Sequence, residues 1–503
     1  MIMDKTSNLH SDWERFVLIV VLTLIFIMAA RTPIDSDMWW HLKSGEVMVE
    51  TGRPLLVDLF SYTRYQSAWT NHSWLSEVGL FLLYKWLHTW GLSAWVACLA
   101  LLSLLFTILQ MESPIILRGF LAVLGSMVSA VVWSPRPQMT SLVCLAGLNF
   151  IIHRARKGEI RYLSLIPGLF ILWSNLHAGY SLGLIFILFV LLGEGLNFLF
   201  GNQNEIGLKQ DGLYRLGWMA LLALGCVAIN PNGIRMWSIP FETVGIQSLQ
   251  SMISEWASPN FHEAVQQPFL WMLCGIIILI GLSRCNPDGV ELVCIAGFAG
   301  MSLIARRNFA PFALVCLPII SRHVVSAWGV CAPRICKFPT IQKMNRLRVE
   351  HSSKTLPAWP QKAFHLFAAG FLMLVAIIKL FWVAHPVMVS HYEAKIFPAS
   401  AVEWIRNQPI QGQMFSEYDW GGYLIWNLDD YPVFVDGRTD LYGDAIIKEW
   451  KSLINGEDGW KEIIKNRRIN TILVRADRPI ITLLQNDGWY TIWRDEQSIV
   501  MER

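Results

Sequence analysis

Charged residues are scarce in this chain. Of its 503 residues, 16% are Asp, Glu, Lys or Arg, whereas 54% are hydrophobic. Soluble proteins usually carry about 25% charged residues, so the composition excludes an ordinary soluble domain and favours a protein embedded in lipid. The net charge of +3 gives no indication of a partner. We expect membrane lipid around the chain and no nucleic acid.

Cysteine is missing from two long regions. The chain has nine cysteines, but none lies in residues 32–76 or 386–503. These regions, which we place outside the membrane below, therefore have no disulfide framework and no cysteine-ligated metal. The chain also lacks internal repeats and the inverted symmetry of many secondary transporters. No small-residue cleavage pattern follows the apolar stretch Phe16–Ala30, so we expect a retained membrane anchor.

Long apolar runs dominate the rest of the sequence. A membrane span needs about 20 apolar residues. About eleven segments meet or approach that length: 14–31, 91–111, 115–134, 137–153, 162–175, 178–200, 213–230, 266–283, 289–305, 308–326 and 363–385. The segment Trp74–Trp90 is interrupted by Glu77, Lys85 and His88. We interpret it as an amphipathic helix on the membrane surface.

Basic loops predict the orientation of these spans. With a cytoplasmic N-terminus, the basic loop 154–161 and the basic run 333–362 both fall inside, as the positive-inside rule requires. If Trp74–Trp90 spanned the membrane, the first of these loops would move outside. We therefore expect a multi-pass protein of the inner or plasma membrane. Its outer face receives residues 32–76, the turns near 136 and 177, the loop 231–265, residues 306–307 and the region after 385.

Residues 386–503 have a different character, because charges rise and short apolar runs alternate. We predict helices at 399–407, near 420–426, near 445–454 and near 460–465. We predict strands at 413–417, 432–435, 471–474, near 490–494 and near 498–501. The expected organisation is a transmembrane domain at 1–385, with an external catalytic loop at 32–76, and an external α/β domain at 386–503.

Two carboxylates, Asp35 and Asp37, follow the first span, and His41 comes shortly after them. Charges at this boundary cost several kcal/mol if they face lipid, so we expect them to face a wet, protein-lined cavity. Asp37 can act as a general base, or can ligate a divalent cation such as magnesium or manganese that neutralises a phosphate leaving group. Asp35 can assist it. The alternative is that both residues only cap the helix that begins at Met38.

A second segment, Trp69–Glu77, repeats the mixture of aromatic, imidazole and carboxylate groups. Asn71, His72 and Glu77 are candidates to bind substrate or metal, and a hydrogen-bonded structural role is the equal alternative. His177 interrupts an apolar stretch. It either lines the same cavity or is a buried, hydrogen-bonded histidine.

Three arginines lie on the outer face against the positive-inside trend: Arg136, Arg306 and Arg307. A guanidinium pairs with phosphate through two hydrogen bonds, so a lipid phosphate or pyrophosphate is the expected ligand. The alternative is that each arginine only reaches toward the membrane interface. Glu255 offers a second outer carboxylate that can complete a metal site with Asp37.

Polar clusters follow two of the predicted strands in the C-terminal region. Polar residues at strand ends are where α/β domains place binding sites, so we expect these clusters to shape the acceptor side. Their candidate residues are Asp419, Trp420, Asp436, Arg438 and Asp440. The alternative is that Gly422 and Gly437 only make turns and that Asp436 only pairs with Arg438.

Two motifs resemble those of one family. The segment Asp37-Met38-Trp39-Trp40-His41-Leu42-Lys43 resembles the Asp-Pro-Trp-Phe-Asn-Tyr-Arg segment in the first external loop of oligosaccharyltransferase catalytic subunits, where the leading Asp binds the metal and helps activate the acceptor. The stretch Tyr418–Tyr423 is similar to that family's WWDYG motif, which reads the acceptor peptide. The paired Trp of that motif is Glu417-Tyr418 here. A later external loop carries Arg136, and no second Asp-x-Asp pair is found.

The order of the parts is also similar to that family and to bacterial RgtA/B/C/D-like proteins. The resemblance implies a polytopic α-helical membrane protein of the GT-C glycosyltransferase architecture with an external α/β domain. It implies inverting transfer of a sugar from a polyprenyl-linked phosphate or pyrophosphate donor to a glycan, lipid or protein acceptor. Two alternatives are an oligosaccharyltransferase that moves a preassembled glycan to protein and a non-enzymatic lipid or solute transporter. A transporter should carry charges at both faces and at mid-membrane depth, whereas here they gather on one side.

Overall fold

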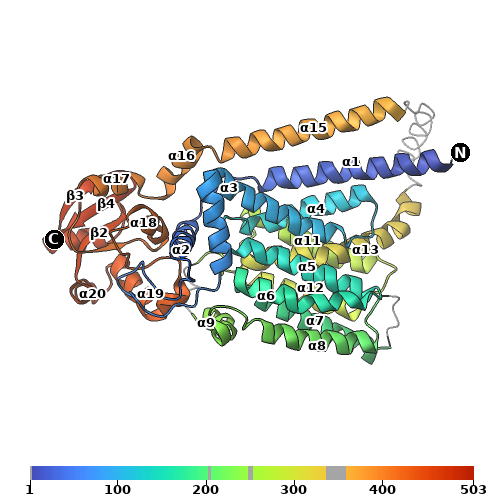
Figure 1. The fold of residues 1–503 in the computed structure, drawn as a ribbon, viewed down its shortest axis with the longest axis horizontal. Coiled ribbons are helices and arrows are strands. Elements are labelled where there is room, and N and C mark those ends of the chain that lie inside the picture. Colours follow the sequence, from blue (N-terminus) through green and yellow to red (C-terminus); the bar gives the residue numbers. More distant parts are fainter. Residues whose placement is uncertain (1–2, 202–205, 247–252, 336–357) are drawn as a thin grey trace.

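The computed structural model describes residues 3–201, 206–246, 253–335 and 358–503. Figure 1 shows an elongated molecule with a helical bundle at one end and a small α/β region at the other. The N-terminus lies at the end of the bundle that is farthest from the C-terminus. Part of the basic run predicted at 333–362 lies outside the described residues.

Helices occupy all eleven segments predicted as spans. Six helical segments of the described chain are long and apolar enough to cross a membrane, and Ile160–Leu176 and Gly289–Ile304 are shorter apolar helices. The number of eleven crossings therefore stays a prediction. The helices of the bundle are α1 (Met3–Ala29), α3 (Trp74–Ile108), α4 (Ile115–Ser129), α5 (Gln138–Arg156), α6 (Ile166–Leu176), α7 (Tyr180–Leu199), α8 (Gln210–Cys226), α11 (Gln267–Leu282), α12 (Gly289–Ile304), α13 (Phe309–Ile335) and α15 (Ala358–Val383).

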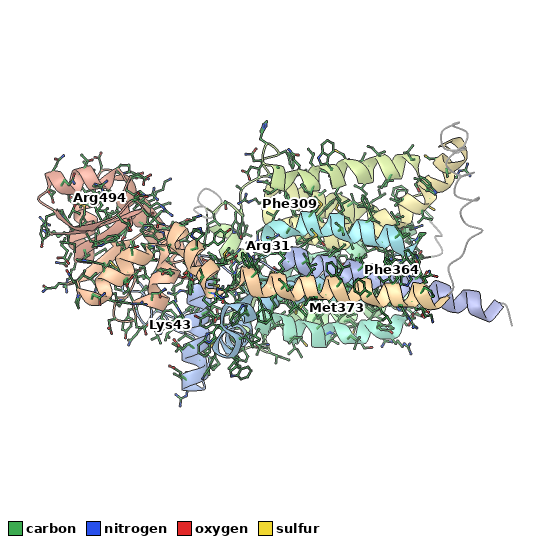
Figure 2. The ribbon with its side chains drawn as sticks, turned by 90° about the horizontal axis from the view of Figure 1, so that it is seen from above. Arg31, Lys43, Phe309, Phe364, Met373 and Arg494 are labelled. Atoms are coloured by element: carbon green, nitrogen blue, oxygen red, sulfur yellow. The ribbon has the colours of Figure 1, made fainter. Side chains whose placement is uncertain are left out.

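Large apolar side chains cover the outside of the bundle. Along α15, Phe364 is 64% exposed and Met373 is 48% exposed, and Figure 2 shows both on this helix. An apolar surface of this extent is stable when it faces lipid chains rather than water. The chain is thus a multi-pass membrane protein.

Helix α3 is broken at His88, whose backbone adopts φ 48° and ψ −141°. The residues before the break begin near α2 (Met38–Thr51), and those after it run into the bundle (Figure 1). This division agrees with the predicted surface helix followed by a span from residue 91.

The C-terminal region contains a four-stranded sheet with the order β1-β2-β4-β3. Strand β1 pairs with β2 in parallel, while β2–β4 and β4–β3 are antiparallel. The strands are β1 (Gln413–Ser416), β2 (Ile469–Arg475), β3 (Tyr490–Arg494) and β4 (Ser498–Glu502). The helices of this region are α16 (Pro386–Ile396), α17 (Ala399–Asn407), α18 (Gly421–Asn427), α19 (Thr439–Asn455), α20 (Trp460–Arg467) and α21 (Ile480–Asn486).

The strand predicted at 432–435 is wrong. Its residues are buried and apolar, but the segment makes only an isolated bridge between Ser61 and Val433. The backbone of Val433 donates to Phe60 (2.9 Å) and accepts from Tyr62 (3.1 Å). An extended apolar segment can satisfy its backbone against a loop as well as against a sheet, and here the loop comes from residues 32–76.

The segment 32–76 and the C-terminal region share a hydrophobic core. Trp39, Trp40 and Leu42 of α2 pack in one cluster with Tyr423 and Leu424 of α18. Segments that lie almost 400 residues apart in the sequence are therefore held together at the end of the bundle that faces the α/β region. This packing positions the site described next.

Candidate functional site

Arg136 lies at the centre of three carboxylates. Its Nη1 donates to Asp37 Oδ2 (2.7 Å), its Nη2 donates to Glu255, and its Nε lies 3.3 Å from Asp35 Oδ2. The four charged side chains are between 13% and 25% exposed. The cluster is therefore mostly shielded from water but still open to a substrate.

Short loops at one end of the bundle deliver these groups. Arg136 stands between Pro135 and Pro137 just before α5, and its Nε donates to Ser134 Oγ (2.9 Å). Asp37 precedes α2 without making a side-chain cap, so the alternative that it only caps this helix is wrong. Asp35 Oδ1 instead accepts a bond from the backbone N–H of Asp37 (2.9 Å), which fixes the turn between the two carboxylates.

The environment shifts the acid–base behaviour of the cluster. Burial raises the pKa of Asp35 to about 6 and also raises the pKa of Asp37, and the charge of Arg136 opposes both shifts. Burial acts in the same direction on Glu255, but Arg136 and Arg307 outweigh it and lower the pKa of this carboxyl. Carboxyl groups with perturbed pKa values in a partly open site are typical of acid–base chemistry.

The backbone of the C-terminal region touches the Asp37 segment. A Cβ atom at Gly437 would lie 1.8 Å from Asp37 Oδ1, and one at Gly422 would lie 2.5 Å from the carbonyl oxygen of Ser36. Neither glycine has the positive φ that a left-handed turn requires. Both positions need glycine for close approach, so the alternative that they only make turns does not explain them.

His41, Asn71 and Glu77 form a buried hydrogen-bonded set beside this segment. His41 Nδ1 lies 2.9 Å from Glu77 Oε1, and Asn71 Nδ2 donates to Glu77 Oε2 (2.7 Å). All three residues are at most 5% exposed. The set ties α2, the external loop and α3 together, and this geometry agrees with the structural alternative for these residues.

His72 and His177 lie side by side at the same end of the bundle. Their rings are 5.7 Å apart and nearly perpendicular. His72 pairs with the Ser73 hydroxyl and His177 with the Ser141 hydroxyl, each at 2.8 Å. Burial lowers the pKa of both imidazoles, so they are neutral near pH 7. Unlike His41, both are only half-buried and remain available to a ligand.

The other two outer arginines differ in their surroundings. The guanidinium carbon of Arg307 lies 4.4 Å from the centre of the Trp256 ring, and the backbone N–H of Arg307 donates to the Glu255 carbonyl (3.1 Å). Arg306 Nη1 lies 3.8 Å from Glu263. Both charges act on Glu255, and the effect of Arg307 is the larger, so Arg307 is the more closely coupled of the two to the carboxylate cluster.

The cluster around Asp419 is already ion-paired. Asp419 Oδ2 accepts from Arg475 (2.5 Å), and Glu417 accepts from both Arg475 (3.0 Å) and Arg478 (2.6 Å). Trp420 is fully buried and donates to the carbonyl of Ile396 (3.0 Å).

Tyr418 contacts Thr439 through its hydroxyl group (2.5 Å). Burial, with the charge of Asp37 as the next contribution, raises the pKa of this phenol. Because the charge of Asp37 acts on its phenol, Tyr418 is the residue of the Tyr418–Tyr423 motif that connects this motif to the carboxylate cluster.

Asp436 and Arg438 form a fully buried network with the external loop. Arg438 binds Asp436 (2.6 Å) and Asp58 (2.7 Å), and Tyr442 donates to Asp436 (2.5 Å). Asp436 does pair with Arg438, as the alternative for this cluster held, but it also accepts from Tyr442, and the network joins the loop to the C-terminal region. Asp440 is only half-buried, and its charge acts on His72.

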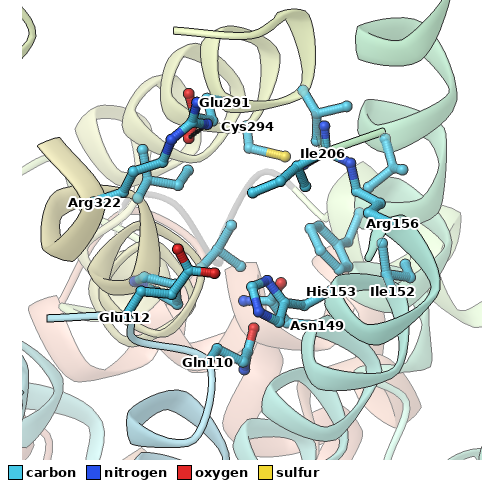
Figure 3. A pocket seen from close by; sticks show the side chains of 16 residues that line it. Gln110, Glu112, Asn149, Ile152, His153, Arg156, Ile206, Glu291, Cys294 and Arg322 are labelled. Carbon is cyan, nitrogen blue, oxygen red and sulfur yellow. Dashed lines mark hydrogen bonds and ion pairs between the residues drawn. The ribbon is translucent and has the colours of Figure 1, made fainter. Parts of the chain in front are cut away.

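A second polar cavity, of about 80 Å³, lies at the opposite end of the bundle (Figure 3). Figure 3 shows Arg156 and Arg322 on opposite sides of it. Arg156 binds Glu194 and Asp288 (2.8 Å each), and Arg322 binds Glu291 (2.9 Å). None of the predicted site residues lines this cavity among the described residues. Its paired charges hold the helices together at this end of the bundle.

Sequence reasoning missed Asp58, Ser134, Tyr418 and Arg475. Arg475 lies outside the motifs described in the sequence analysis. Its partners Glu417 and Asp419 precede it by more than 50 residues, so no local pattern indicated the pairing. The proline pair that flanks Arg136 was the available signal for Ser134, because it fixes the turn that these residues share.

No family model matches the chain, and no curated protein sequence is similar to it. Solved structures do match. The apo oligosaccharyltransferase of Archaeoglobus fulgidus gives a TM-score of 0.54 at 12% identity over 92% of this chain and 69% of that chain. Its AglB complex with an inhibitory peptide and a dolichol-phosphate gives 0.53, also at 12% identity and with the same coverage.

Apo ArnT from Cupriavidus metallidurans gives a TM-score of 0.49 at 12% identity, over 100% of this chain and 98% of that chain. The match to the archaeal oligosaccharyltransferase shows that the chain has the fold of the GT-C glycosyltransferases.

Proposed function

We propose that the protein is an inverting glycosyltransferase that moves a sugar from a polyprenyl-linked phosphate donor to an acceptor at the external membrane face. The observation that carries the proposal is a partly exposed Asp37, bonded to Arg136 at the end of a GT-C bundle. The archaeal protein with this fold has been solved with a dolichol-phosphate and a peptide. A lipid-linked donor is therefore the natural substrate class.

Asp37 serves as the general base in this proposal. Its Oδ2 is held by Arg136, whereas Oδ1 lies beside the backbone of Gly437. Asp37 accepts the proton of the acceptor hydroxyl while the acceptor oxygen bonds to the anomeric carbon. The bond from that carbon to the phosphate oxygen breaks, and the polyprenyl phosphate or pyrophosphate leaves with the electron pair. A base and a cation near the leaving phosphate are sufficient for inversion.

Arg307 is the best-placed residue for the leaving phosphate. Three carboxylates already engage Arg136, and Arg306 faces Glu263, whereas Arg307 stacks on Trp256 next to the cluster. We assign the half-buried His72, His177 and Asp440 to the lining of the sugar cavity. His41, Asn71, Glu77, Asp436 and Arg438 then act as positioning residues, because their polar groups are buried and paired.

A divalent cation does not fit between Asp37 and Glu255. Both carboxylates bind the guanidinium of Arg136, which fills the space between them. In the described part of the chain, no group of three or more His, Cys, Asp or Glu residues is arranged to hold a metal ion. We therefore derive no step through a metal.

We infer that the acceptor is a glycan or lipid hydroxyl and not a peptide. The resemblance assigns peptide recognition to the WWDYG motif, whose Asp corresponds to Asp419. Here Asp419 is bound to Arg475, and the motif's paired Trp is absent. Both features count against the alternative of transfer to a protein sequon.

We propose that the end carrying Asp37 is external. The basic residues Arg154, Arg156 and Lys157 lie at the far end of α5 from Arg136. A 19-residue helix is about 28 Å long, close to the thickness of the hydrocarbon core. The positive-inside rule then places the N-terminus in the cytoplasm and residues 386–503 outside as an external α/β domain.

The proposal is tested in membranes supplied with a labelled polyprenyl-linked sugar. We expect Asp37→Asn to lower transfer about 10²- to 10⁴-fold, because the general base is lost. Asp429→Asn is the matched control, since Asp429 forms an ion pair with Lys43 of α2 and is 64% exposed. Unchanged transfer by a folded Asp37→Asn protein would refute the assignment.

A further inference from the structure

We propose that Arg136 is the permanent cation of the carboxylate cluster and takes the position that a divalent metal ion would otherwise occupy. The catalytic meaning of this inference rests on the proposed function, but its structural content does not. It makes the site independent of magnesium, manganese or any other exchangeable cation.

The geometry of Arg136 supports a fixed cation. Its three nitrogen atoms face three different carboxylates: Nη1 faces Asp37, Nη2 faces Glu255 and Nε faces Asp35. A metal ion bound by these same carboxylates would have to lie where the guanidinium lies. Carboxylate oxygens are the preferred ligands of hard divalent cations. The carboxylates of such a site are therefore present, but the guanidinium of Arg136 occupies the space between them.

The loop that carries Arg136 holds the guanidinium in place. Pro135 and Pro137 flank the residue, and Nε donates to Ser134 Oγ (2.9 Å). The backbone N–H of Arg136 also donates to the Ser134 carbonyl oxygen (2.7 Å). A side chain fixed from both its backbone and its own nitrogen is not easily displaced by an ion from solution.

Charge leads to the same conclusion. Arg136 supplies one positive charge to the three carboxylates, and Arg307 adds a second close to Glu255. These two guanidinium groups offset most of the negative charge of the three carboxylates, so the cluster attracts a divalent ion far less than three free carboxylates would. The chain therefore disfavours a metal in this cluster both by occupancy and by weakened attraction.

Removal of Arg136 should convert the cluster into a metal site. In Arg136→Ala, the carboxylates of Asp35, Asp37 and Glu255, which the guanidinium holds too far apart to ligate one ion, would be free to close on a cation. We expect this variant to bind Mn²⁺ at least about tenfold more tightly than the wild type, through hard oxygen ligands. The additional change Asp37→Asn should abolish the gain.

The experiment measures Mn²⁺ binding to the purified full-length protein by calorimetry and by the electron paramagnetic resonance signal of free Mn²⁺. Arg306→Ala is the matched control, because it removes a neighbouring arginine that is paired with Glu263 (3.8 Å) instead of with the three carboxylates. We expect no gain in Mn²⁺ binding from this variant. Arg136→Met, which keeps the bulk of the side chain, is measured in parallel, and thermal unfolding shows which variants are folded.

Two results would overturn the inference. One is Mn²⁺ binding to the wild type that is lost in Asp37→Asn, because it would place a metal in the cluster despite Arg136. The other is a folded Arg136→Ala protein that binds Mn²⁺ no better than the wild type. Neither result depends on sugar transfer, so failure of the metal inference is distinguishable from failure of the proposed function.

Discussion

The protonation of Asp37 should control the lower pH limit of activity. Burial raises the pKa of Asp37 and raises that of its neighbour Asp35 to about 6, and the two groups share Arg136. The base form is therefore lost on acidification at a higher pH than for an exposed aspartate. We expect the logarithm of kcat/KM to fall as the pH is lowered through about 6. Because the carboxyl groups are coupled, the apparent pKa of this limb describes the whole cluster and not Asp37 alone.

Arg136→Gln should move this acidic limb to a still higher pH. The guanidinium favours the ionised carboxylates, so its loss leaves burial unopposed and raises their pKa values further. A pH–rate profile of the two proteins checks the expectation, with Arg306→Gln as the control that keeps the wild-type limb. An acidic limb near pH 4 in the wild type, or one that Arg136→Gln leaves in place, would contradict it.

Residue types in the sequence were enough to identify the charged residues of the site, but not which of them bind one another. Asp37, Arg136, Glu255 and Arg307 had all been predicted to lie on the outer face, and the structure brings them together. That Arg136 binds the carboxylates was not foreseen, because the two groups lie 99 residues apart. Such a pairing depends on helix packing, which local sequence patterns do not contain.

Glycines of the C-terminal region set how closely it approaches α2. We expect Gly437→Ala to lower transfer about 10²-fold, because a Cβ atom 1.8 Å from Asp37 Oδ1 must displace the carboxylate that we propose as the general base. Gly147→Ala is the matched control, since a Cβ atom there has no neighbour within 4 Å. Kinetics of both variants check this expectation, and equal activity of the two would show that the contact does not position Asp37.

Elements with a clear period were predictable from the sequence. The helix predicted at 399–407 is α17, and the strand predicted at 471–474 lies within β2. The buried segment 432–435 was taken for a strand, because apolar extended segments have the same composition whether they pair with a sheet or with a loop. The short helices α16 and α21 were not predicted, since few turns give little periodicity.

On the scale of the whole molecule, Arg438 joins the external loop to the C-terminal region. We expect Arg438→Ala to destabilise the protein by about 3–5 kcal/mol, because Asp58 and Asp436 would remain as buried, uncompensated charges. Arg494→Ala, on the exposed far side of the domain (Figure 2), should stay within about 0.5 kcal/mol of the wild type. Denaturant unfolding measures both. Equal stability of the two variants would show that the network does not hold the domain.

The division of charges between the two ends of the bundle was predictable from the sequence, because basic loops and apolar runs alternate along it. The shared core of α2 and α18 was not predictable, since it joins segments separated by almost 400 residues. This core makes the segment 32–76 and the C-terminal region one structural unit. Under the proposed function, we expect transfer to need both parts of the chain in place.

The most direct test of the account is the product formed by the purified protein in liposomes with a labelled polyprenyl-linked sugar and glycan or lipid acceptors. Mass spectrometry and NMR of the product identify the new bond and its anomeric configuration. We expect the wild type to form a glycosidic bond of inverted configuration, and Asp37→Asn to form almost none. A sugar that stays on its lipid and only changes leaflet, or equal product from Asp37→Asn, would contradict the account.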